Sequence, residues 1–412
     1  MGIWVVFLTI CSIIEAAKLG LLRNATIKFL HSSRYSENKD DVQFASLIVN
    51  CLFTIVIILL ILLFGKLFAL YLKTAEIAPL LKWAILLFIV QIPFHHCELV
   101  QQSNLQFKSS FWAYLLRQGL FFAGVFIFAF WYKEFISFIN LVLLQLMSLL
   151  AGLIYFLIST RKLLLTTFHF RWSIVSDMLQ FGKYVLGTNL FSNLARYTDH
   201  FVTANAIGNP VLGKTYVSYY NAVGRIIGLV DLPSFAVADI LFPKNVQAIE
   251  QEGNQKVRYY VERSLGYNIA VLIPLCTIIF ILAEYVIILF AGRDYLPAVD
   301  LVRITLLFAF IRPLFPQFGS IMDSLGKPMI NFWVNMMGLV LNIIFTYAGY
   351  KFLNMGMYGG VFGSMVGAVA SYGVAYYFLH REIGYKNRHV MHYTVQAYKD
   401  MYAFAISKFK RS

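Results

Sequence analysis

Polar and ionisable residues recur on one face of the apolar stretch at 179–206. Intervals of four, three and four residues separate Asn189, Asn193, Arg196 and His200. These intervals place the four side chains on one side of an α-helix, and Asp199 lies near enough along that helix to pair with Arg196. An arginine at mid-bilayer costs about 2.5–3.5 kcal/mol on insertion scales, so it faces a partner or a wet cavity. The chemistry that this face predicts is anion binding or proton exchange.

The next apolar stretch, 214–241, carries a similar face. Asn221 and Arg225 lie four residues apart, and the aromatic residues that precede them are Tyr216, Tyr219 and Tyr220. Two interpretations of the buried arginines remain open. They form structural ion pairs between packed helices, or they line a wet cavity that binds an anion. Because ionisable groups inside a membrane are functional by default, the sequence favours the second interpretation.

The first apolar stretch holds a third group of charges. Glu15 and Lys18 are three residues apart, and Arg23 follows near the end of the stretch. Lys18 and Arg23 could bind an anion, although Arg23 could equally extend to the lipid headgroups. Glu15 and Asp199 could carry protons, bind a cation, or only neutralise the basic residues.

The elements that must position these residues are membrane-spanning helices. Hydrophobic residues make up 59% of the chain and charged residues 13%, whereas soluble domains average about 45–50% and about 25%. A helix needs about 20 largely apolar residues to cross about 30 Å of hydrocarbon. The eleven predicted spans are 2–19, 43–64, 77–99, 110–131, 135–159, 179–206, 214–241, 264–290, 298–323, 328–352 and 355–380. The alternation of barrel strands is missing, so we expect an all-α polytopic membrane protein.

Basic residues predict the orientation of these spans. Loops that alternate along the chain fall into two sets, one with about 20 Lys and Arg residues and the other with about six, and the positive-inside rule places the richer set in the cytoplasm. The net charge of +14 is therefore expected to orient the chain rather than to bind nucleic acid. The basic tail at 381–412 belongs to the cytoplasmic set, where anionic lipid headgroups are its expected contact.

This orientation leaves the first span without a basic flank. An odd number of spans with a cytoplasmic tail puts Met1 outside, so we expect that one helix precedes the first span. A protein with a true odd number of spans is the alternative. The predicted domains are two parallel helical bundles around a central cavity, an N-terminal lobe of about five helices and a C-terminal lobe of six. The limits of the N-terminal lobe, linker, C-terminal lobe and tail are 1–160, 161–178, 179–380 and 381–412.

Four local motifs bear on architecture more than on chemistry. Gly208–Thr215 matches the phosphate-binding P-loop pattern, but a membrane helix precedes it and Pro210 interrupts it, so we expect a tight extracytoplasmic turn. The run His95–Glu98 cannot share a metal ion unaided, because adjacent helical residues diverge by about 100°, and a polar cytoplasmic helix end is expected instead. Arg312 lies beside prolines whose free carbonyls it could satisfy. A ridge for close helix packing is formed by Gly359, Gly363 and Gly367.

Several short stretches together resemble a known family. They are Phe181-Gly182-Lys183-Tyr184, Leu212-Gly213-x-x-Tyr216, Leu241-Phe242-Pro243-Lys244, Ala291-Gly292-Arg293-Asp294-Tyr295-Leu296-Pro297-Ala298, Ser324-Leu325-Gly326-Lys327-Pro328 with Asn342 downstream, and Met355-Gly356-x-x-Gly359-Gly360-x-x-Gly363. In this order and spacing they resemble the O-antigen flippase (Wzx-like) branch of the multidrug/oligosaccharidyl-lipid/polysaccharide (MOP) exporter superfamily. The first half is similar chiefly in hydropathy and in Gly20-Leu-Leu-Arg23.

The resemblance implies two six-helix lobes around a cavity that alternates between inward-open and outward-open states. It also implies a cargo of sugar repeat units on undecaprenyl pyrophosphate, flipped from the inner to the outer leaflet of the bacterial cytoplasmic membrane for polysaccharide or O-antigen synthesis. Arginine forks would grip the pyrophosphate oxygens, and the tyrosines at 216, 219 and 220 would stack on sugars or pack in the core. The expected substrate-binding residues are Arg196, Arg225, Lys18, Arg23, Asn193 and Asn221.

No nucleotide, cofactor, metal or catalytic site is expected, so the work would come from an ion or voltage gradient or from downstream consumption. Our hypothesis is that Asp199, Glu15 and His200 couple transport to a proton or a monovalent cation. Two alternatives remain open. An ion-coupled multidrug exporter on the same scaffold would need a cavity dominated by carboxylates. A membrane-embedded glycan polymerase, which is an enzyme, would need a large extracytoplasmic loop or a constellation of catalytic carboxylates.

Overall fold

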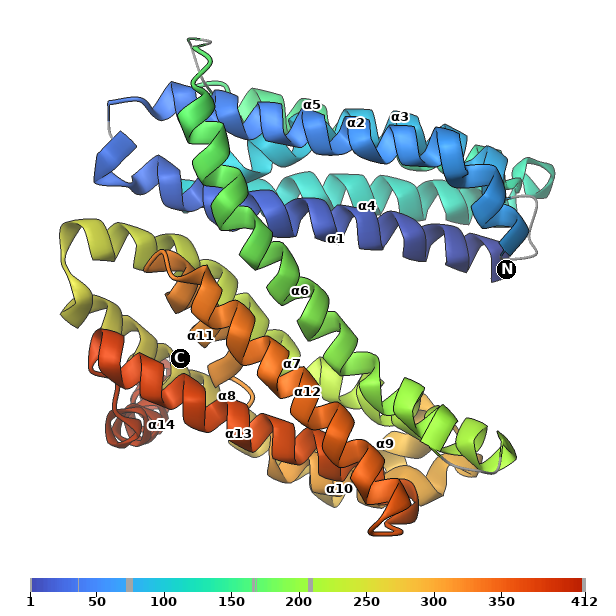
Figure 1. The fold of residues 1–412 in the computed structure, drawn as a ribbon, viewed down its shortest axis with the longest axis vertical. Helices are drawn as coiled ribbons and strands as arrows, with labels where there is room; N and C mark the ends of the chain where they lie inside the picture. Colours follow the sequence, from blue (N-terminus) through green and yellow to red (C-terminus); the bar gives the residue numbers. More distant parts are fainter. Residues whose placement is uncertain are drawn as a thin grey trace. The chain divides into compact units, whose positions relative to one another are not determined.

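The structure is a computed structural model of the 412-residue chain, and it describes residues 2–35, 37–71, 77–164, 167, 169–206 and 210–409. Throughout these residues the regular structure is helical, with no strand among them, which confirms the all-α prediction (Figure 1). The chain divides into two compact units, Met1–Leu186 and Gly187–Ser412. Each unit is a bundle with its own apolar clusters.

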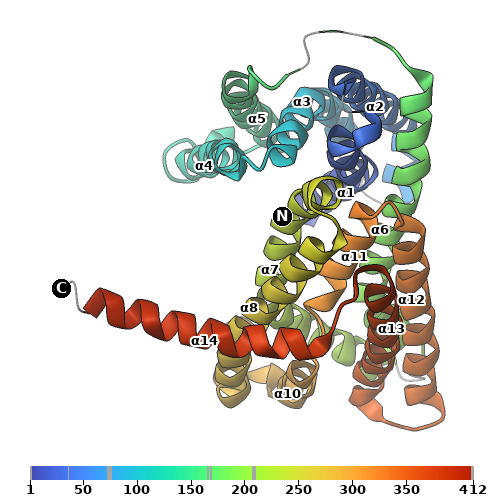
Figure 2. The same ribbon diagram turned by 90° about the vertical axis from the view of Figure 1, so that its left-hand side faces the viewer.

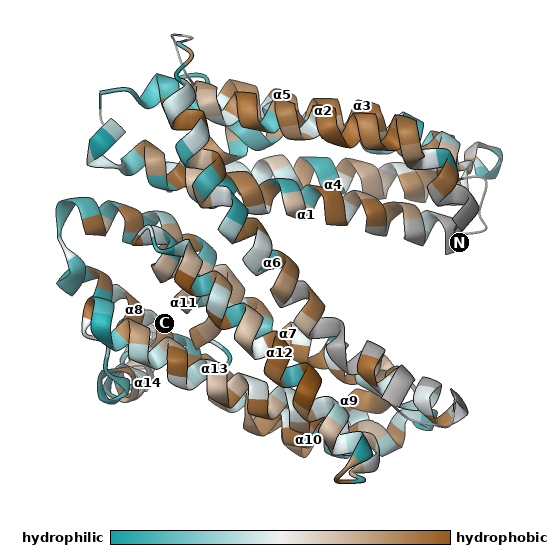
Figure 3. Cartoon of the chain, in the orientation of Figure 1, coloured by the Kyte–Doolittle hydropathy of each residue, from teal (hydrophilic) through white to brown (hydrophobic). Residues whose placement is uncertain are grey.

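Unit 1 is built from five long helices and the start of a sixth. They are α1 (Gly2–His31), α2 (Lys39–Tyr71), α3 (Ile77–Ser103), α4 (Phe107–Phe130), α5 (Phe138–Thr160) and α6 (Trp172–Ala206), with the 3-10 helices η1 (Ser33–Tyr35) and η2 (Lys133–Phe135) in the turns. The Ser137 hydroxyl caps α5 by accepting a hydrogen bond from the backbone N–H of Asn140 at 3.2 Å. Apolar residues dominate the middle of α2 and α3 in Figure 3, as expected where a helix crosses lipid.

The core of unit 1 joins α3, α4 and α5. The rings of Phe94 and Phe156 meet edge to face, with their centroids 4.9 Å apart. A Cβ at Gly152 would lie 3.0 Å from the carbonyl oxygen of Ala113, so the glycine lets α4 and α5 approach closely. This tight packing holds the polar residues of the same helices in fixed positions.

The segment between α5 and α6 is tied to the start of α2. The backbone N–H and the hydroxyl of Thr167 both donate to the Asp40 carboxylate at 3.0 Å, and Arg171 pairs with Asp41 at 2.8 Å. The two aspartates also lie in the first turn of α2, where the helix dipole favours negative charge. The linker predicted at 161–178 is partly helical, because α6 begins at Trp172.

Unit 2 contains the remaining helices. They are α7 (Pro210–Gln251), α8 (Asn254–Ile281), α9 (Ala283–Phe290), η3 (Arg293–Ala298), α10 (Val299–Leu307), α11 (Leu314–Ser324), α12 (Pro328–Lys351), η4 (Gly356–Tyr358), α13 (Gly359–Ile383) and α14 (Asn387–Phe409). The predicted glycine ridge is confirmed, because a Cβ at Gly367 would lie 2.9 Å from the carbonyl oxygen of Gly338 on α12. The ridge packs α13 against α12 along their length.

Eight helices within the described residues are long and apolar enough to cross a membrane. The predicted span at 298–323 is wrong as a continuous helix: α10 ends at Leu307 and α11 begins at Leu314, because the chain turns before Pro313. The predicted span at 264–290 is likewise interrupted at Leu282, between α8 and α9. The first and sixth predicted spans lie in α1 and α6, which are not among the eight.

Most of the described part of the basic tail forms the helix α14. Figure 2 shows α14 as a long helix that crosses α8. The Tyr398 hydroxyl donates to the carbonyl of Ala270 at 2.8 Å, and His389 and the Lys386 backbone N–H both contact the buried Glu262 carboxylate. These bonds attach α14 to unit 2.

Candidate functional site

A buried ionic cluster in unit 1 is centred on Glu15 of α1. Its carboxylate oxygen Oε1 lies 3.1 Å from His95 Nε2 of α3 and 3.3 Å from a terminal nitrogen of Arg117 on α4. The His95 side chain is 0% exposed and that of Arg117 8%, whereas Glu15 retains 23%. The Arg117 guanidinium also lies over the Phe94 ring, 5.3 Å from its centroid. Glu15 is therefore engaged by two basic side chains within its own unit.

A second polar chain holds Arg23. Its Nε donates to Gln102 Oε1 at 2.9 Å, and Gln102 Nε2 donates to Glu98 Oε1 at 3.0 Å. The other oxygen of Glu98 accepts from the Tyr114 hydroxyl at 2.9 Å. Arg23 is half-buried in this chain, which runs from α1 through α3 to α4. The expectation of a polar helix end at His95–Glu98 is wrong, because α3 continues to Ser103 and these residues are buried.

Lys18 is the most unusual residue in unit 1. Only 2% of its surface is exposed, and no described residue forms a hydrogen bond with its Nζ. Buried side-chain atoms without a hydrogen-bond partner also occur on α2 and α3, at Asn50 Oδ1, Gln91 Oε1 and both ring nitrogens of His96. A buried ammonium group without a hydrogen-bond partner is costly, so this position favours an anionic or water-borne partner.

In unit 2 the candidate residues lie on α7. Asn221 and Arg225 are both exposed within their unit, on the same face of the helix. Asn221 Nδ2 donates to the carbonyl of Val217, one turn earlier, at 3.1 Å. Among the described carboxylates, none pairs with Arg225. Its guanidinium is therefore available to a ligand.

Unlike Arg225, both Arg312 and Tyr220 are held by contacts within unit 2. Arg312 Nε donates to Asp231 Oδ1 of α7 at 2.8 Å, and a terminal nitrogen of the same guanidinium binds Oδ2. Arg312 thus forms a structural ion pair with Asp231 at the break between α10 and α11. The Tyr220 hydroxyl lies 3.1 Å from that of Tyr350 and accepts from the Gly360 N–H at 3.1 Å. Because Tyr220 is buried, core packing accounts for it.

Four candidate residues have side chains outside the described part of the structure. They are Asn193, Arg196, Asp199 and His200. The backbone of α6 is helical through this segment. Because the four side chains are not described, the common face that the sequence predicts for them stays a prediction. The first two residues of the P-loop-like motif, 208 and 209, also lie outside the described residues.

Sequence reasoning missed Arg117 and the role of His95. Arg117 lies well inside the predicted span 110–131, and the same search for charges in apolar stretches would have found it. His95 lies close to Glu15 only because α1 packs against α3. No local sequence pattern near His95 predicts its contact with Glu15.

Comparison with known proteins identifies the family. Residues 1–300 match the family model described as polysaccharide biosynthesis protein. An uncharacterised membrane protein of Methanocaldococcus jannaschii is 22% identical over 183 residues, which are 43% of this chain and 34% of that protein. The chain thus matches only about a third of the length of this relative.

Solved structures of transporters share the fold. An outward-facing multidrug resistance MATE family transporter of the MOP superfamily has a TM-score of 0.79 at 17% identity, over 93% of this chain and 88% of that one. A MOP superfamily transporter from Pyrococcus furiosus has a TM-score of 0.77 at 18% identity, over 92% and 86%. From the match over residues 1–300 and this shared architecture, the chain is a multi-pass membrane protein that belongs to the polysaccharide biosynthesis protein family and has the fold of the MOP superfamily.

Proposed function

We propose that this protein is a flippase that moves polyprenyl-pyrophosphate-linked oligosaccharides from the inner to the outer leaflet of the bacterial cytoplasmic membrane. The family description supports a role in polysaccharide biosynthesis. The observation that carries the proposal is the charge balance of the described helices. The Glu15 carboxylate is engaged by Arg117 and His95, whereas Lys18 and Arg225 have no ion pair with a described carboxylate.

This balance suits an anionic cargo. A glycan on a pyrophosphate cannot cross hydrocarbon unaided, because each unpaired polar group costs several kcal/mol there. Cationic side chains in a hydrated cavity replace water around the pyrophosphate oxygens, and guanidinium groups bind them through two hydrogen bonds at once. The polyprenyl chain remains in lipid during the movement. Lys18, Arg23, Arg196 and Arg225 are the proposed binding residues, together with Asn193 and Asn221.

We also propose a source of work for transport and an orientation of the protein in the membrane. Asp199, Glu15 and His200 are the proposed groups that exchange a proton or a monovalent cation, since one charge that crosses 100 mV supplies about 2.3 kcal/mol. The basic turns, including that between α7 and α8, face the cytoplasm, as does the C-terminus. The protein then acts by alternating access and needs no covalent chemistry.

Reconstituted proteoliposomes with labelled lipid-linked oligosaccharide test this function. Lys18→Met and Arg225→Gln should each lower the rate of translocation by about tenfold, because one hydrogen bond to a charged group contributes about 1.5–3 kcal/mol. Lys351→Gln, at the exposed end of α12, removes a charge elsewhere and should leave the rate unchanged. Wild-type rates in both Lys18→Met and Arg225→Gln would refute the anion-binding role.

A multidrug exporter on the same scaffold is the second candidate, since a multidrug resistance transporter shares the fold. The Pyrococcus furiosus protein is itself described as having a reverse polarity of its binding pocket that suggests a different function. Export of a small cationic dye by the same proteoliposomes, with no movement of the labelled glycolipid, would favour this candidate.

A further inference from the structure

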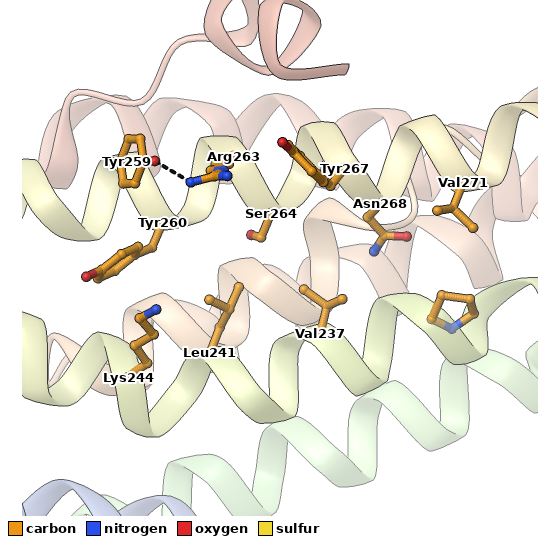
Figure 4. A pocket seen from close by; sticks show the side chains of 11 residues that line it. Val237, Leu241, Lys244, Tyr259, Tyr260, Arg263, Ser264, Tyr267, Asn268 and Val271 are labelled. Carbon is orange, nitrogen blue, oxygen red and sulfur yellow. Dashed lines mark hydrogen bonds between the residues drawn. The ribbon is translucent and has the colours of Figure 1, made fainter. Parts of the chain in front are cut away.

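A groove between α7 and α8 lies apart from the proposed substrate-binding and ion-coupling residues. Its volume is about 500 Å³, and Figure 4 shows the side chains that line it. Lys244, Tyr259, Tyr260 and Arg263 occupy one end, and Val237 and Val271 lie toward the other. The groove is therefore polar and cationic at one end and mainly apolar at the other, where Asn268 is also part of the lining.

The two cations are held by aromatic rings instead of carboxylates. Lys244 Nζ lies 4.2 Å from the centroid of the Tyr260 ring. The Arg263 guanidinium carbon lies 5.3 Å from the Tyr267 ring and 5.7 Å from the Tyr259 ring, and its terminal nitrogen donates to the Tyr259 hydroxyl at 2.5 Å. No described carboxylate forms an ion pair with either cation. Two positive charges therefore face the groove without compensation, which favours an anion.

One tyrosine that holds Arg263 also binds an acidic group of α14. Asp400 of α14 accepts a hydrogen bond from the Tyr267 hydroxyl, and the Tyr259 ring meets the Tyr393 ring of α14 edge to face at 6.0 Å. The tyrosines that hold Arg263 thus also contact α14. An anion at Arg263 would act on the same side chains that attach the C-terminal helix.

The shape of the groove matches a lipid better than a free ion. Lys244 and Pro233 are eleven residues apart on α7, a rise of about 16 Å along the helix axis. Tyrosine, lysine and arginine at one end suit the headgroup region, and valine and proline at the other suit acyl chains. A phosphate ion would leave the apolar half unfilled, and a choline or ethanolamine headgroup would bring a cation toward Lys244 and Arg263.

We propose that the α7–α8 groove binds an anionic phospholipid, with its phosphate between Lys244 and Arg263 and an acyl chain along Val237 and Val271. The occupied leaflet is the one at the turn between α7 and α8, at residues 252–253, because Lys244 and Arg263 lie nearer to that turn along their helices than Val237 and Val271 do. The site is separate from the proposed transport residues, so it binds a resident lipid and not the cargo.

Native mass spectrometry of the purified full chain tests the site with phosphatidylglycerol and phosphatidylcholine as probes. Wild-type protein should retain phosphatidylglycerol about tenfold more tightly, because basic residues near a bilayer attract anionic lipid. The double variant Lys244→Gln, Arg263→Gln should lose this preference. The matched control Arg293→Gln, Lys351→Gln removes two exposed charges outside the groove and should keep it.

A third variant separates a lipid from a free anion. Val237→Trp keeps both cations and fills the apolar half, so it should lower phosphatidylglycerol retention severalfold. Equal retention of both lipids by wild type, or full retention by the double variant or by Val237→Trp, would overturn the proposal. So would displacement of phosphatidylglycerol by inorganic phosphate alone or preferentially by a polyprenyl pyrophosphate.

Discussion

Arg312 and Asp231 form an ion pair that joins the break between α10 and α11 to the middle of α7. The guanidinium reaches both carboxylate oxygens, with Nε 2.8 Å from Oδ1. Two parallel hydrogen bonds of this kind fix the geometry as well as the charge. The guanidinium therefore binds a carboxylate of α7 and not the carbonyls freed by the neighbouring prolines, as the sequence had suggested.

We expect this pair to show coupling in a double-mutant cycle. Arg312→Met and Asp231→Asn should each lower the thermal stability of the detergent-solubilised protein. The double variant should lose less than the sum of the two, with a coupling energy of about 1–3 kcal/mol. Melting temperatures of the four proteins, read by intrinsic fluorescence, measure the coupling. Strict additivity would show that the two side chains do not interact.

Loss of the Glu15 carboxylate should destabilise unit 1. Glu15→Gln leaves Arg117, only 8% exposed, without its anionic partner, which costs about 3–5 kcal/mol. The double variant Glu15→Gln, Arg117→Met should recover much of that loss, because the buried charge is then gone. Thermal melting in detergent checks both values.

A surface pair provides the control for Glu15. Glu284 lies 3.5 Å from Arg303, and its side chain is 61% exposed. Glu284→Gln should therefore change stability by less than about 1 kcal/mol. If Glu15→Gln is equally mild, the cluster around Glu15 is not structural.

The attachment of α14 should depend on Gly266. A Cβ at this position would lie 2.6 Å from Tyr393 Cβ and 2.8 Å from the carbonyl oxygen of Val390, both on α14. Gly266→Ala should therefore force α14 away from α8, at a cost of about 1–3 kcal/mol. Limited proteolysis should then cut the C-terminal helix faster. Gly373→Ala meets no atom within 4 Å, and an equal increase in cleavage in that variant would contradict the prediction.

High pH should weaken the turn between α1 and α2. Burial, followed by the hydrogen bond from its hydroxyl to Asp177, raises the pKa of Tyr35 from 10.0 to about 12. Because the folded state favours the protonated phenol, its contribution to stability is complete below pH 10 and is lost as the pH rises toward 12. Tyr35→Phe should flatten the loss of stability in this range. Thermal melting between pH 9 and 12 provides the comparison, and identical pH profiles for both proteins would exclude this role.

Composition and hydropathy were sufficient to predict the fold class, because only helical bundles and closed barrels satisfy the backbone in lipid, and the alternation of barrel strands is missing. The glycine ridge at 359–367 was equally visible, since small residues at intervals of four form one continuous face. The same local patterns predicted a continuous helix at 298–323, where Arg312 and Pro313 interrupt it. Hydropathy averages over a window and does not report a turn within it.

Charges within apolar stretches were visible in the chain as candidates, but their roles depend on neighbours that lie far away in the sequence. Glu15 is 80 residues from His95 and 102 from Arg117, and Arg312 is 81 from Asp231. One arginine pairs with a carboxylate while another, Arg225, remains exposed, although both occupy similar apolar surroundings. A residue's type and periodicity depend on the local chain alone. Desolvation and ion pairing depend instead on which helices pack together. Only the packed bundle therefore distinguishes a structural ion pair from a charged group that is available to a ligand.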